Sequence, residues 1–216
     1  MNGIHTTPSP ISLRMATQAD ADAFLAVYGP YVENTAISFE YQVPTREEFA
    51  RRIGGTLKRY PYLAALQEGQ VVGYAYASPF NRRSAYSWSA EVSIYVAGDA
   101  RGSGIGARLY HALESILKKQ NVLNVNACIA YPNPGSISFH EKLGYKKAGH
   151  FTKCGYKLGR WWDMVWMEKC WGNTLRNRKI LFLLQNWGRK TYVIYSLPAP
   201  HSPSFYIIGS VRIPSK

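Results

Sequence analysis

The sequence lacks the features of exported, membrane-bound and metal-binding proteins. It has no apolar run near the roughly 20 residues that span a bilayer, and residues 1–10 contain no basic start followed by an apolar stretch. Its three cysteines, Cys128, Cys154 and Cys170, form no CxxC spacing, and no HExxH motif is present. We therefore expect no membrane anchor, no disulfide framework and no metal site, and we predict a cytoplasmic protein with reduced thiols.

Acidic residues are scarce, and the end of the chain has none. The chain carries 26 Lys and Arg against 13 Asp and Glu, a net charge of +13, and seven of the basic residues follow Cys170 without a single acid. Residues 1–170 keep 19 basic and 13 acidic groups, a surplus of +6 that suits a phosphorylated ligand. The basic end leaves open a non-enzymatic module that binds nucleic acid. Because that end has no recognisable nucleic-acid motif, we rank this alternative low.

The chain length predicts one domain, which we place at 11–169, with a basic extension at 170–216. Within the extension we expect a basic helix at 175–187 and poor order from Ser196 onward. Hydrophobic periodicity, turn residues and Thr-x-x-Asp or Thr-x-x-Glu capping signals predict a mixed α/β domain. Its expected strands are 12–15, 62–67, 70–78, 88–96, 123–129, 146–151 and 164–168, and its expected helices are 19–32, 46–58, 107–120 and 136–143.

A glycine-rich loop, 97–106, joins an expected strand to an expected helix. Glycines let backbone N–H groups converge on a phosphate, a helix start adds its positive dipole end, and Arg101 supplies a charge. A dinucleotide site would want an acid about 20 residues further on, but the following strand offers only Asn124 and Asn126, and the lysine of a P-loop is missing. The loop therefore predicts a phosphate site of another kind, with a purely structural turn as the alternative.

The motifs around this loop resemble a known family. Arg101-x-x-Gly104-x-Gly106, then Asn133 and the run 139–145 (Phe-His-Glu-Lys-Leu-Gly-Tyr), are similar to the cofactor motifs of the GCN5-related N-acetyltransferase (GNAT) superfamily. The resemblance narrows to phosphinothricin and methionine-sulfone acetyltransferases through several further stretches: 14–20, 59–63, 85–91, 132–133 and 155–157.

This resemblance implies the GNAT fold, a largely antiparallel central sheet flanked by helices that splays between the strand of Glu91 and the strand at 123–129. It also implies acetyl-coenzyme A as co-substrate, without a metal, and direct acetyl transfer in a ternary complex. The residues it assigns to the cofactor are Ile94, Tyr95, Val96, Arg101, Gly102, Ser103, Gly104, Ile105, Gly106 and Asn133.

Two residues are candidates for proton transfer. An amino acid is an ammonium ion at neutral pH, so a base must generate the amine nucleophile, and Glu91, in the middle of an alternating strand, is the candidate. His140 stands where the wider superfamily often has a tyrosine general acid, and imidazole suits that duty. A solvent-facing Glu91 and a merely packed His140 remain the alternatives, with Tyr145 and Tyr131 as substitute acids.

For the acceptor, the resemblance implies contacts from Phe39, Arg83 and Tyr86 with a small amino acid analogue that carries a carboxylate and an oxyanion. Asn81, Arg82 and Gly102 depart from the family pattern. A protein N-terminus or a polyamine is the alternative acceptor, although a polyamine would want acids where the chain has Arg83. The resemblance further implies a homodimer and a role in herbicide or antibiotic resistance.

Overall fold

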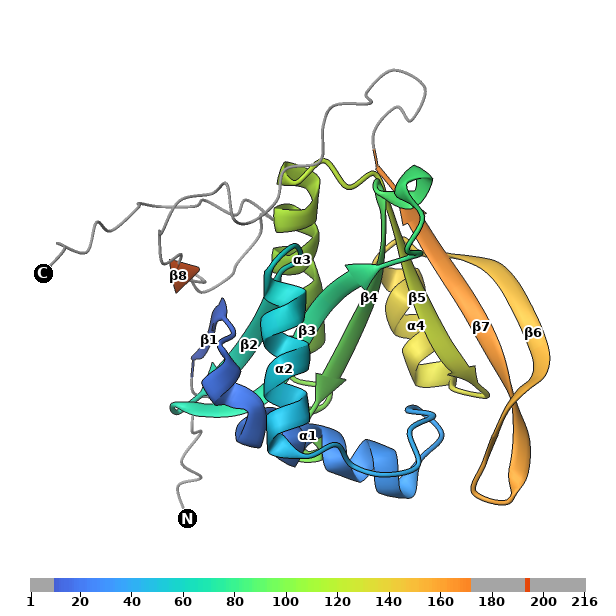
Figure 1. Ribbon diagram of the computed structural model, residues 1–216, viewed down its shortest axis with the longest axis horizontal. Helices are drawn as coiled ribbons and strands as arrows, with labels where there is room; N and C mark the ends of the chain where they lie inside the picture. The colour runs from blue at the N-terminus through green and yellow to red at the C-terminus, as the bar shows by residue number, and fades with distance from the viewer. Residues whose placement is uncertain (1–9, 172–192, 195–216) are drawn as a thin grey trace, which may run out of the picture.

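A computed structural model describes residues 10–171 and 193–194 (Figure 1). The expected extension at 170–216, with its basic helix and poorly ordered end, therefore lies almost wholly outside the described residues. Three short 3-10 turns, η1 (Gln18–Asp20), η2 (Ser84–Tyr86) and η3 (Gly98–Ala100), accompany the main elements. In chain order these are β1 (Ile11–Met15), α1 (Ala21–Asn34), α2 (Arg46–Leu57), β2 (Tyr62–Gln67), β3 (Gln70–Pro79), β4 (Ser89–Val96), α3 (Ile105–Lys119), β5 (Asn124–Tyr131), α4 (Pro134–Lys142), β6 (Lys146–Lys157), β7 (Arg160–Cys170) and β8 (Val193–Ile194).

The strands form one sheet in the order β6-β7-β5-β4-β3-β2-β1-β8. Neighbouring strands run antiparallel except β4 and β5, which run parallel and pair only from Ser89–Glu91 to Asn124–Asn126. Beyond Glu91 the two strands separate, as Figure 1 shows. The mixed, mostly antiparallel sheet predicted from the sequence is confirmed, and so is its splay.

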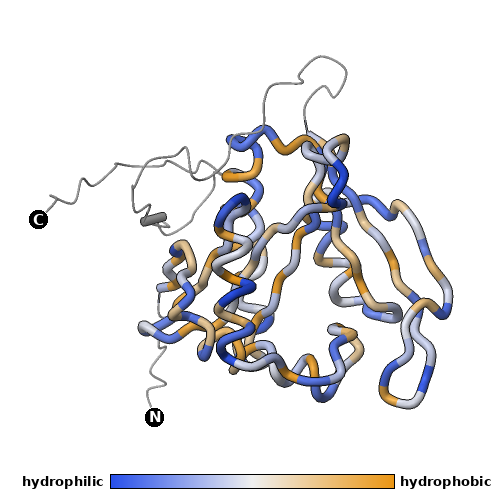
Figure 2. The backbone as a smooth tube through the Cα atoms, in the orientation of Figure 1, coloured by the Kyte–Doolittle hydropathy of each residue, from blue (hydrophilic) through white to orange (hydrophobic). Residues whose placement is uncertain are grey.

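Helices cover both faces of the sheet. Successive residues of β2 point to opposite faces, so Leu63 and Ala65 join the apolar cluster under α3, whereas Tyr62 and Ala64 join the cluster under α1 and α2. A strand buried on both faces reads as a continuous apolar run, which is how 62–66 appears in the sequence. Figure 2 shows hydrophobic residues recurring along the central strands and hydrophilic residues along α2.

The two predicted helix starts differ in their chemistry. At the first, Asp20 completes the capping box by accepting from the Thr17 backbone N–H at 2.7 Å, and it also pairs with Arg14. At the second, Thr45 accepts from the backbone N–H of Glu48 at 3.2 Å, which confirms the N-cap. The Glu48 carboxylate does not close that box, because it pairs with Arg52 one turn further along α2.

The last two strands are longer than the sequence predicted. The expected strands at 146–151 and 164–168 are parts of one long hairpin, β6 and β7, that turns at Leu158-Gly159. No strand pattern is visible in the sequence at 152–163, because this part of the hairpin is largely exposed on both faces and the two-residue alternation of a half-buried strand is absent. A register shift between Phe151 and Gly155 further interrupts the pattern.

Candidate active site

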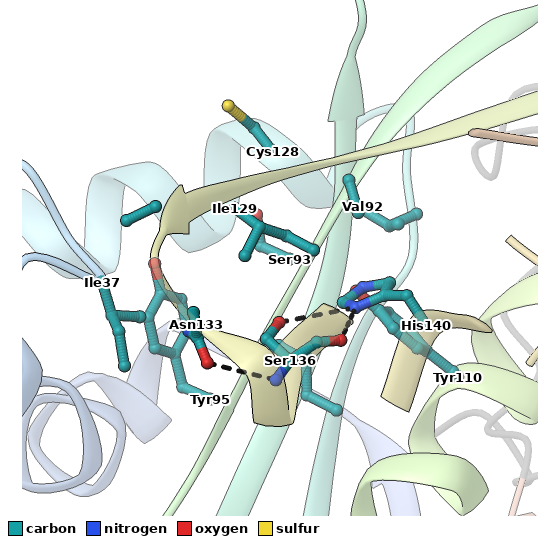
Figure 3. Close-up of a pocket in the computed structure, with 13 residues that line it drawn as sticks. Ile37, Val92, Ser93, Tyr95, Tyr110, Cys128, Ile129, Asn133, Ser136 and His140 are labelled. Carbon is teal, nitrogen blue, oxygen red and sulfur yellow. Dashed lines mark hydrogen bonds between the residues drawn. The ribbon is translucent and has the colours of Figure 1, made fainter. Parts of the chain in front are cut away.

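A cavity opens where β4 and β5 separate, and helices α3 and α4 close it (Figure 3). Its lining combines apolar side chains with a few hydroxyl, amide and imidazole groups, as small-molecule sites usually do. The lining residues are Ile37, Val92, Ser93, Ile94, Tyr95, Tyr110, Ala127, Cys128, Ile129, Ala130, Asn133, Ser136 and His140.

The backbone of β4 supplies one edge of this gap. The bond from the Ala97 N–H to the Val72 carbonyl continues a ladder in which alternate residues of β4 bond to β3. By that alternation the N–H and C=O groups of Tyr95 point to β3, and those of Ile94 and Val96 point toward β5. At this position β4 and β5 no longer pair. The Tyr31 hydroxyl already donates to the Val96 carbonyl, at 2.5 Å. Ile94 therefore offers the backbone groups, and Tyr95 contributes its ring.

The loop at 101–106 has the geometry that a phosphate site needs. Gly102 and Gly104 adopt φ values of +79° and +82°, a left-handed conformation that glycine tolerates, and Gly104 is the N-cap of α3. At both positions the space around a would-be Cβ is open. The Arg101 guanidinium lies 4.9 Å from the centre of the Tyr31 ring, which holds it at the loop. A 15-residue helix thus presents its N-terminal N–H groups beside a fixed cation.

Packing explains two further loop positions. The Ser103 hydroxyl donates to the Ala100 carbonyl at 2.7 Å and closes the turn before α3. A Cβ on Gly106 would lie only 3.1 Å from the Phe139 ring, so glycine lets α3 approach α4 closely. Ile105 is buried beneath the loop. These residues shape the loop rather than offer it charged groups.

Asn133 starts α4 at the mouth of the cavity. Its side-chain oxygen accepts from the Ser136 backbone N–H at 3.1 Å, an N-cap bond that is visible in Figure 3. Asn133 also lines the cavity. Its contact with the pantetheine arm stays a prediction.

His140 is 3% exposed and lies in a closed hydrogen-bond arrangement. Its Nδ1 is 2.8 Å from the Ser136 carbonyl, which can only accept, so Nδ1 carries the proton and Nε2 is the acceptor. Nε2 lies 3.1 Å from the Tyr110 hydroxyl, which therefore donates to it. Burial lowers the pKa of His140, against the Ser136 bond and the Glu114 charge, and keeps the ring neutral.

Tyr110, from α3, is the site residue that sequence reasoning missed. Its ring stacks on Phe139 and meets His140 edge to face, and burial raises the pKa of its hydroxyl. In the sequence it reads as one apolar position of an amphipathic helix, so no signal marked it. Of the two phenols expected as substitutes, Tyr145 packs its ring beside His140 and Tyr110 but donates its hydroxyl to Glu114, and the Tyr131 ring packs on His150.

Glu91 lies at the closed end of the gap, at the last paired position of β4. It is half-buried and shares a sheet face with Ser93 and Tyr95, which line the cavity. Burial raises the pKa of this carboxyl. Burial of Cys128, and after it the charge of Glu91, raises the pKa of the Cys128 thiol to about 12, which keeps that thiol protonated. The position suits a base at the inner end of a cleft.

Phe39, Arg83 and Tyr86 belong to two loops, and none of them is among the residues that line the cavity. Phe39 packs so closely on Gly155 of β6 that a Cβ there has no room. Tyr86 is 38% exposed, with its ring 5.8 Å from that of Phe80, which in turn meets Trp166 of β7 edge to face. Arg83 is exposed at the N-cap of η2. The structure thus places the two aromatic rings near β6 and β7 and leaves Arg83 exposed, and their contact with an acceptor stays a prediction.

Comparison with known protein families decides which reaction class this geometry serves. The family described as "Acetyltransferase (GNAT) domain" matches residues 13–166. The chain belongs to the GNAT acetyltransferase family. It is therefore an N-acetyltransferase, and acetyl-coenzyme A is the acetyl donor that this family uses.

Curated relatives of the chain include acetyltransferases named for phosphinothricin and for methionine sulfoximine and methionine sulfone. The phosphinothricin N-acetyltransferase of Streptomyces viridochromogenes is 35% identical over 160 residues, which cover 74% of this chain and 87% of the relative. An L-methionine sulfoximine/L-methionine sulfone acetyltransferase from Pseudomonas paraeruginosa is 34% identical over 159 residues, covering 73% and 92%.

Solved structures of the family share the fold. A phosphinothricin acetyltransferase from Sinorhizobium meliloti in complex with acetyl-coenzyme A superposes with a TM-score of 0.76 at 35% identity, covering 79% of this chain and 94% of that one. A ribosomal-protein-alanine N-acetyltransferase from Brucella melitensis gives a TM-score of 0.72 at 36% identity, covering 74% and 99%.

Proposed function

We propose that this protein transfers the acetyl group of acetyl-coenzyme A to the α-amino group of a small amino acid analogue of the phosphinothricin, methionine sulfone or methionine sulfoximine type. The observation that carries the proposal is the gap between β4 and β5, with Glu91 at its closed end and the end of the glycine loop, Gly106, beside Ile94, which lines the cavity. The similarity to acetyltransferases named for these acceptors supports the substrate class.

The described residues fit coenzyme A. The N-terminus of α3, Arg101 and the open space at Gly102 and Gly104 would hold the pyrophosphate. Ile94 would pair with the pantetheine arm through its backbone, and Asn133 would donate to that arm from α4. When bound, the cofactor supplies the activated thioester, and the chain supplies position and proton transfer.

Both substrates bind before reaction in this proposal. Arg83 would pair with an anionic group of the acceptor, while Phe39 and Tyr86 would wall its side chain. Glu91 would take the proton that the ammonium must lose, directly or through water, and the amine would then attack the thioester carbonyl. The new C–N bond forms, the C–S bond breaks, and the thiolate of coenzyme A departs.

The departing sulfur needs a hydrogen-bond donor, and the geometry supports two residues acting together. Tyr110 and His140 both line the cavity, and the O–H between them belongs to Tyr110, because His140 accepts through Nε2. We propose that this O–H turns from Nε2 of His140 to the departing sulfur and returns to His140 between turnovers. We expect Tyr110→Phe to lower kcat about 10- to 100-fold with little change in the KM of acetyl-coenzyme A.

The test of the proposed function is thiol release from acetyl-coenzyme A with phosphinothricin, methionine sulfone and methionine sulfoximine offered separately. Turnover that disappears in Glu91→Gln supports the proposal and ranks the acceptors. Coenzyme A binding without acetylation of any of the three amines overturns the acceptor class and leaves the cofactor site standing. The similar ribosomal-protein-alanine acetyltransferase makes a peptide with a free N-terminal alanine the comparison substrate.

A further inference from the structure

Three successive residues at the end of β6, Gly155, Tyr156 and Lys157, contact the connection between α1 and α2. We name the segment 35–45 the acceptor loop. It carries Ile37, which lines the cavity, and Phe39, the proposed wall of the acceptor site. In Figure 1 the end of the β6–β7 hairpin lies beyond the sheet, on the side where this loop runs.

Lys157 makes the most unusual of these contacts. The residue is only 3% exposed, and its Nζ donates to the carbonyls of Val32 and Ser38, both at 2.6 Å. Val32 belongs to the last turn of α1, whose carbonyls have no partner within the helix. One ammonium group therefore caps α1 and holds the acceptor loop six residues later.

The other two contacts act on the same loop. The Tyr41 hydroxyl donates to the Tyr156 carbonyl at 2.6 Å, although the Tyr41 side chain is 72% exposed. The Phe39 ring covers the backbone of Gly155. Between these points the Ser38 hydroxyl bonds to Tyr28 of α1 at 2.6 Å. Along 32–41, four residues thus contact a strand end that lies more than 110 positions away in the chain.

A buried lysine is costly unless its N–H groups are satisfied, and burial accordingly lowers the pKa of Lys157. Both bonds that the structure gives it go to carbonyl oxygens of the loop side. The ammonium group of Lys157 is therefore not directed at the carboxylate of an acceptor. Its two hydrogen bonds instead hold the acceptor loop in position. Positioning of this kind matters because small displacements of a substrate-contacting group reduce rates strongly.

We propose that Lys157 is a positioning residue for the acceptor site: through Val32 and Ser38 it sets where the acceptor loop, with Ile37 and Phe39, stands over the cleft. The β6–β7 hairpin thereby controls binding of the amine and leaves the coenzyme A site unaffected. The kinetic part of this inference rests on the proposed function; the loop contacts do not.

The experiment compares Lys157→Met and Tyr41→Phe with a matched control, Lys169→Met. Lys169 is also a partly buried lysine, but it pairs with Glu114 under α3 at 2.7 Å, away from the acceptor loop. We expect Lys157→Met to raise the KM of the amine about tenfold and Tyr41→Phe about threefold, with the KM of acetyl-coenzyme A within about twofold of wild type. Lys169→Met should lower Tm and leave the KM of the amine unchanged.

Amide hydrogen exchange over 35–45 provides a readout that needs no activity. Exchange should accelerate in Lys157→Met and Tyr41→Phe and not in Lys169→Met. If Lys157→Met does not fold, Tyr41→Phe carries the test, because its exposed hydroxyl contributes little to the core. The inference is overturned if exchange stays at the wild-type rate in Tyr41→Phe, or if Lys157→Met changes both KM values and kcat in the same proportion as Lys169→Met.

The two proposals fail separately. If wild type acetylates none of the amines, the proposed function fails, while faster exchange in the two loop variants still supports the positioning role. If wild type is active and both loop variants keep its amine KM, the positioning role fails and the proposed function stands.

Discussion

Glu91, the proposed general base, lies where burial affects both its proton affinity and the stability of the fold. The carboxylate is half-buried at the end of the β4–β5 pairing, and the structure gives burial as the cause of its raised pKa. A raised pKa brings a carboxylate nearer to neutral pH, where it accepts protons more effectively. The same burial disfavours the ionised form in the folded protein. Both effects can be measured on one variant.

The first prediction concerns activity. Glu91→Gln should lower kcat with the amine acceptor by about 10²- to 10⁴-fold, the usual contribution of a general base, while coenzyme A binding stays unchanged. In wild type, kcat/KM should fall as the pH drops through the pKa of Glu91, at a higher pH than an ordinary glutamate would give. Steady-state rates across pH test this. An acid limb that persists unchanged in the variant would assign the base to another group.

The second prediction concerns stability. Because the pKa of Glu91 is raised in the folded protein, the stabilising effect of the protonated carboxyl is complete below its ordinary pKa and is lost as the pH rises through the raised value. Glutamine stays neutral throughout. Glu91→Gln should therefore melt above wild type at about pH 8, and the difference should vanish at about pH 4. Equal melting temperatures at both pH values would show that burial of this charge costs nothing.

At the scale of elements, the loop before α3 depends on backbone conformation more than on side chains. Gly102 and Gly104 take positive φ values with open space around them, so no packing requires glycine there. Their conformation is what turns the chain into α3 and aims its first N–H groups outward. The strain of a side chain in this conformation, about 1–2 kcal/mol, is thus the quantity to test.

The third prediction follows from that strain. Gly104→Ala should raise the Kd of coenzyme A about tenfold, since 1.4 kcal/mol corresponds to a factor of ten. Gly98→Ala is the matched control, because Gly98 also has open space around it but no positive φ. Isothermal titration calorimetry on both variants gives the comparison. Equal losses in the two would assign the effect to added bulk in the loop.

At the scale of the molecule, the described part of the chain is one helix-covered sheet, and the β6–β7 hairpin extends past the other strands. Several large side chains of that hairpin are exposed, among them Phe151, Leu158 and Trp161 at 55–58%. No helix among residues 10–171 is long and apolar enough to cross a membrane. The homodimer and the cytoplasmic location stay predictions.

The fourth prediction separates the enzyme from the basic module. Light scattering on the full chain should give twice the chain mass, and added duplex DNA at physiological salt should leave the acetylation rate unchanged, because none of the residues proposed for catalysis or binding follows Cys170 in the sequence. A monomer at micromolar concentration would contradict the dimer. DNA that inhibits in proportion to its binding would revive the nucleic-acid alternative.

The sequence predicted most elements and the family because their signals are local. Alternation marked the half-buried strands, capping residues marked the starts of α1 and α2, and the Arg101 loop with Asn133 carried the cofactor motifs. The full length of the β6–β7 hairpin was not predicted, because its exposed strands have no burial pattern. Tyr110 escaped because a helical tyrosine facing a cavity looks the same in sequence as one packed in a core.

The sequence by itself determined the fold class, the family and the residues of the cofactor motifs, because these follow from patterns within short stretches. Tertiary structure alone decided how they meet: which nitrogen of His140 accepts from Tyr110, which backbone groups of β4 face the gap, and that Lys157 holds a loop from the other end of the domain. These are contacts between residues 30 to 125 positions apart, and only folding brings such residues within hydrogen-bond distance.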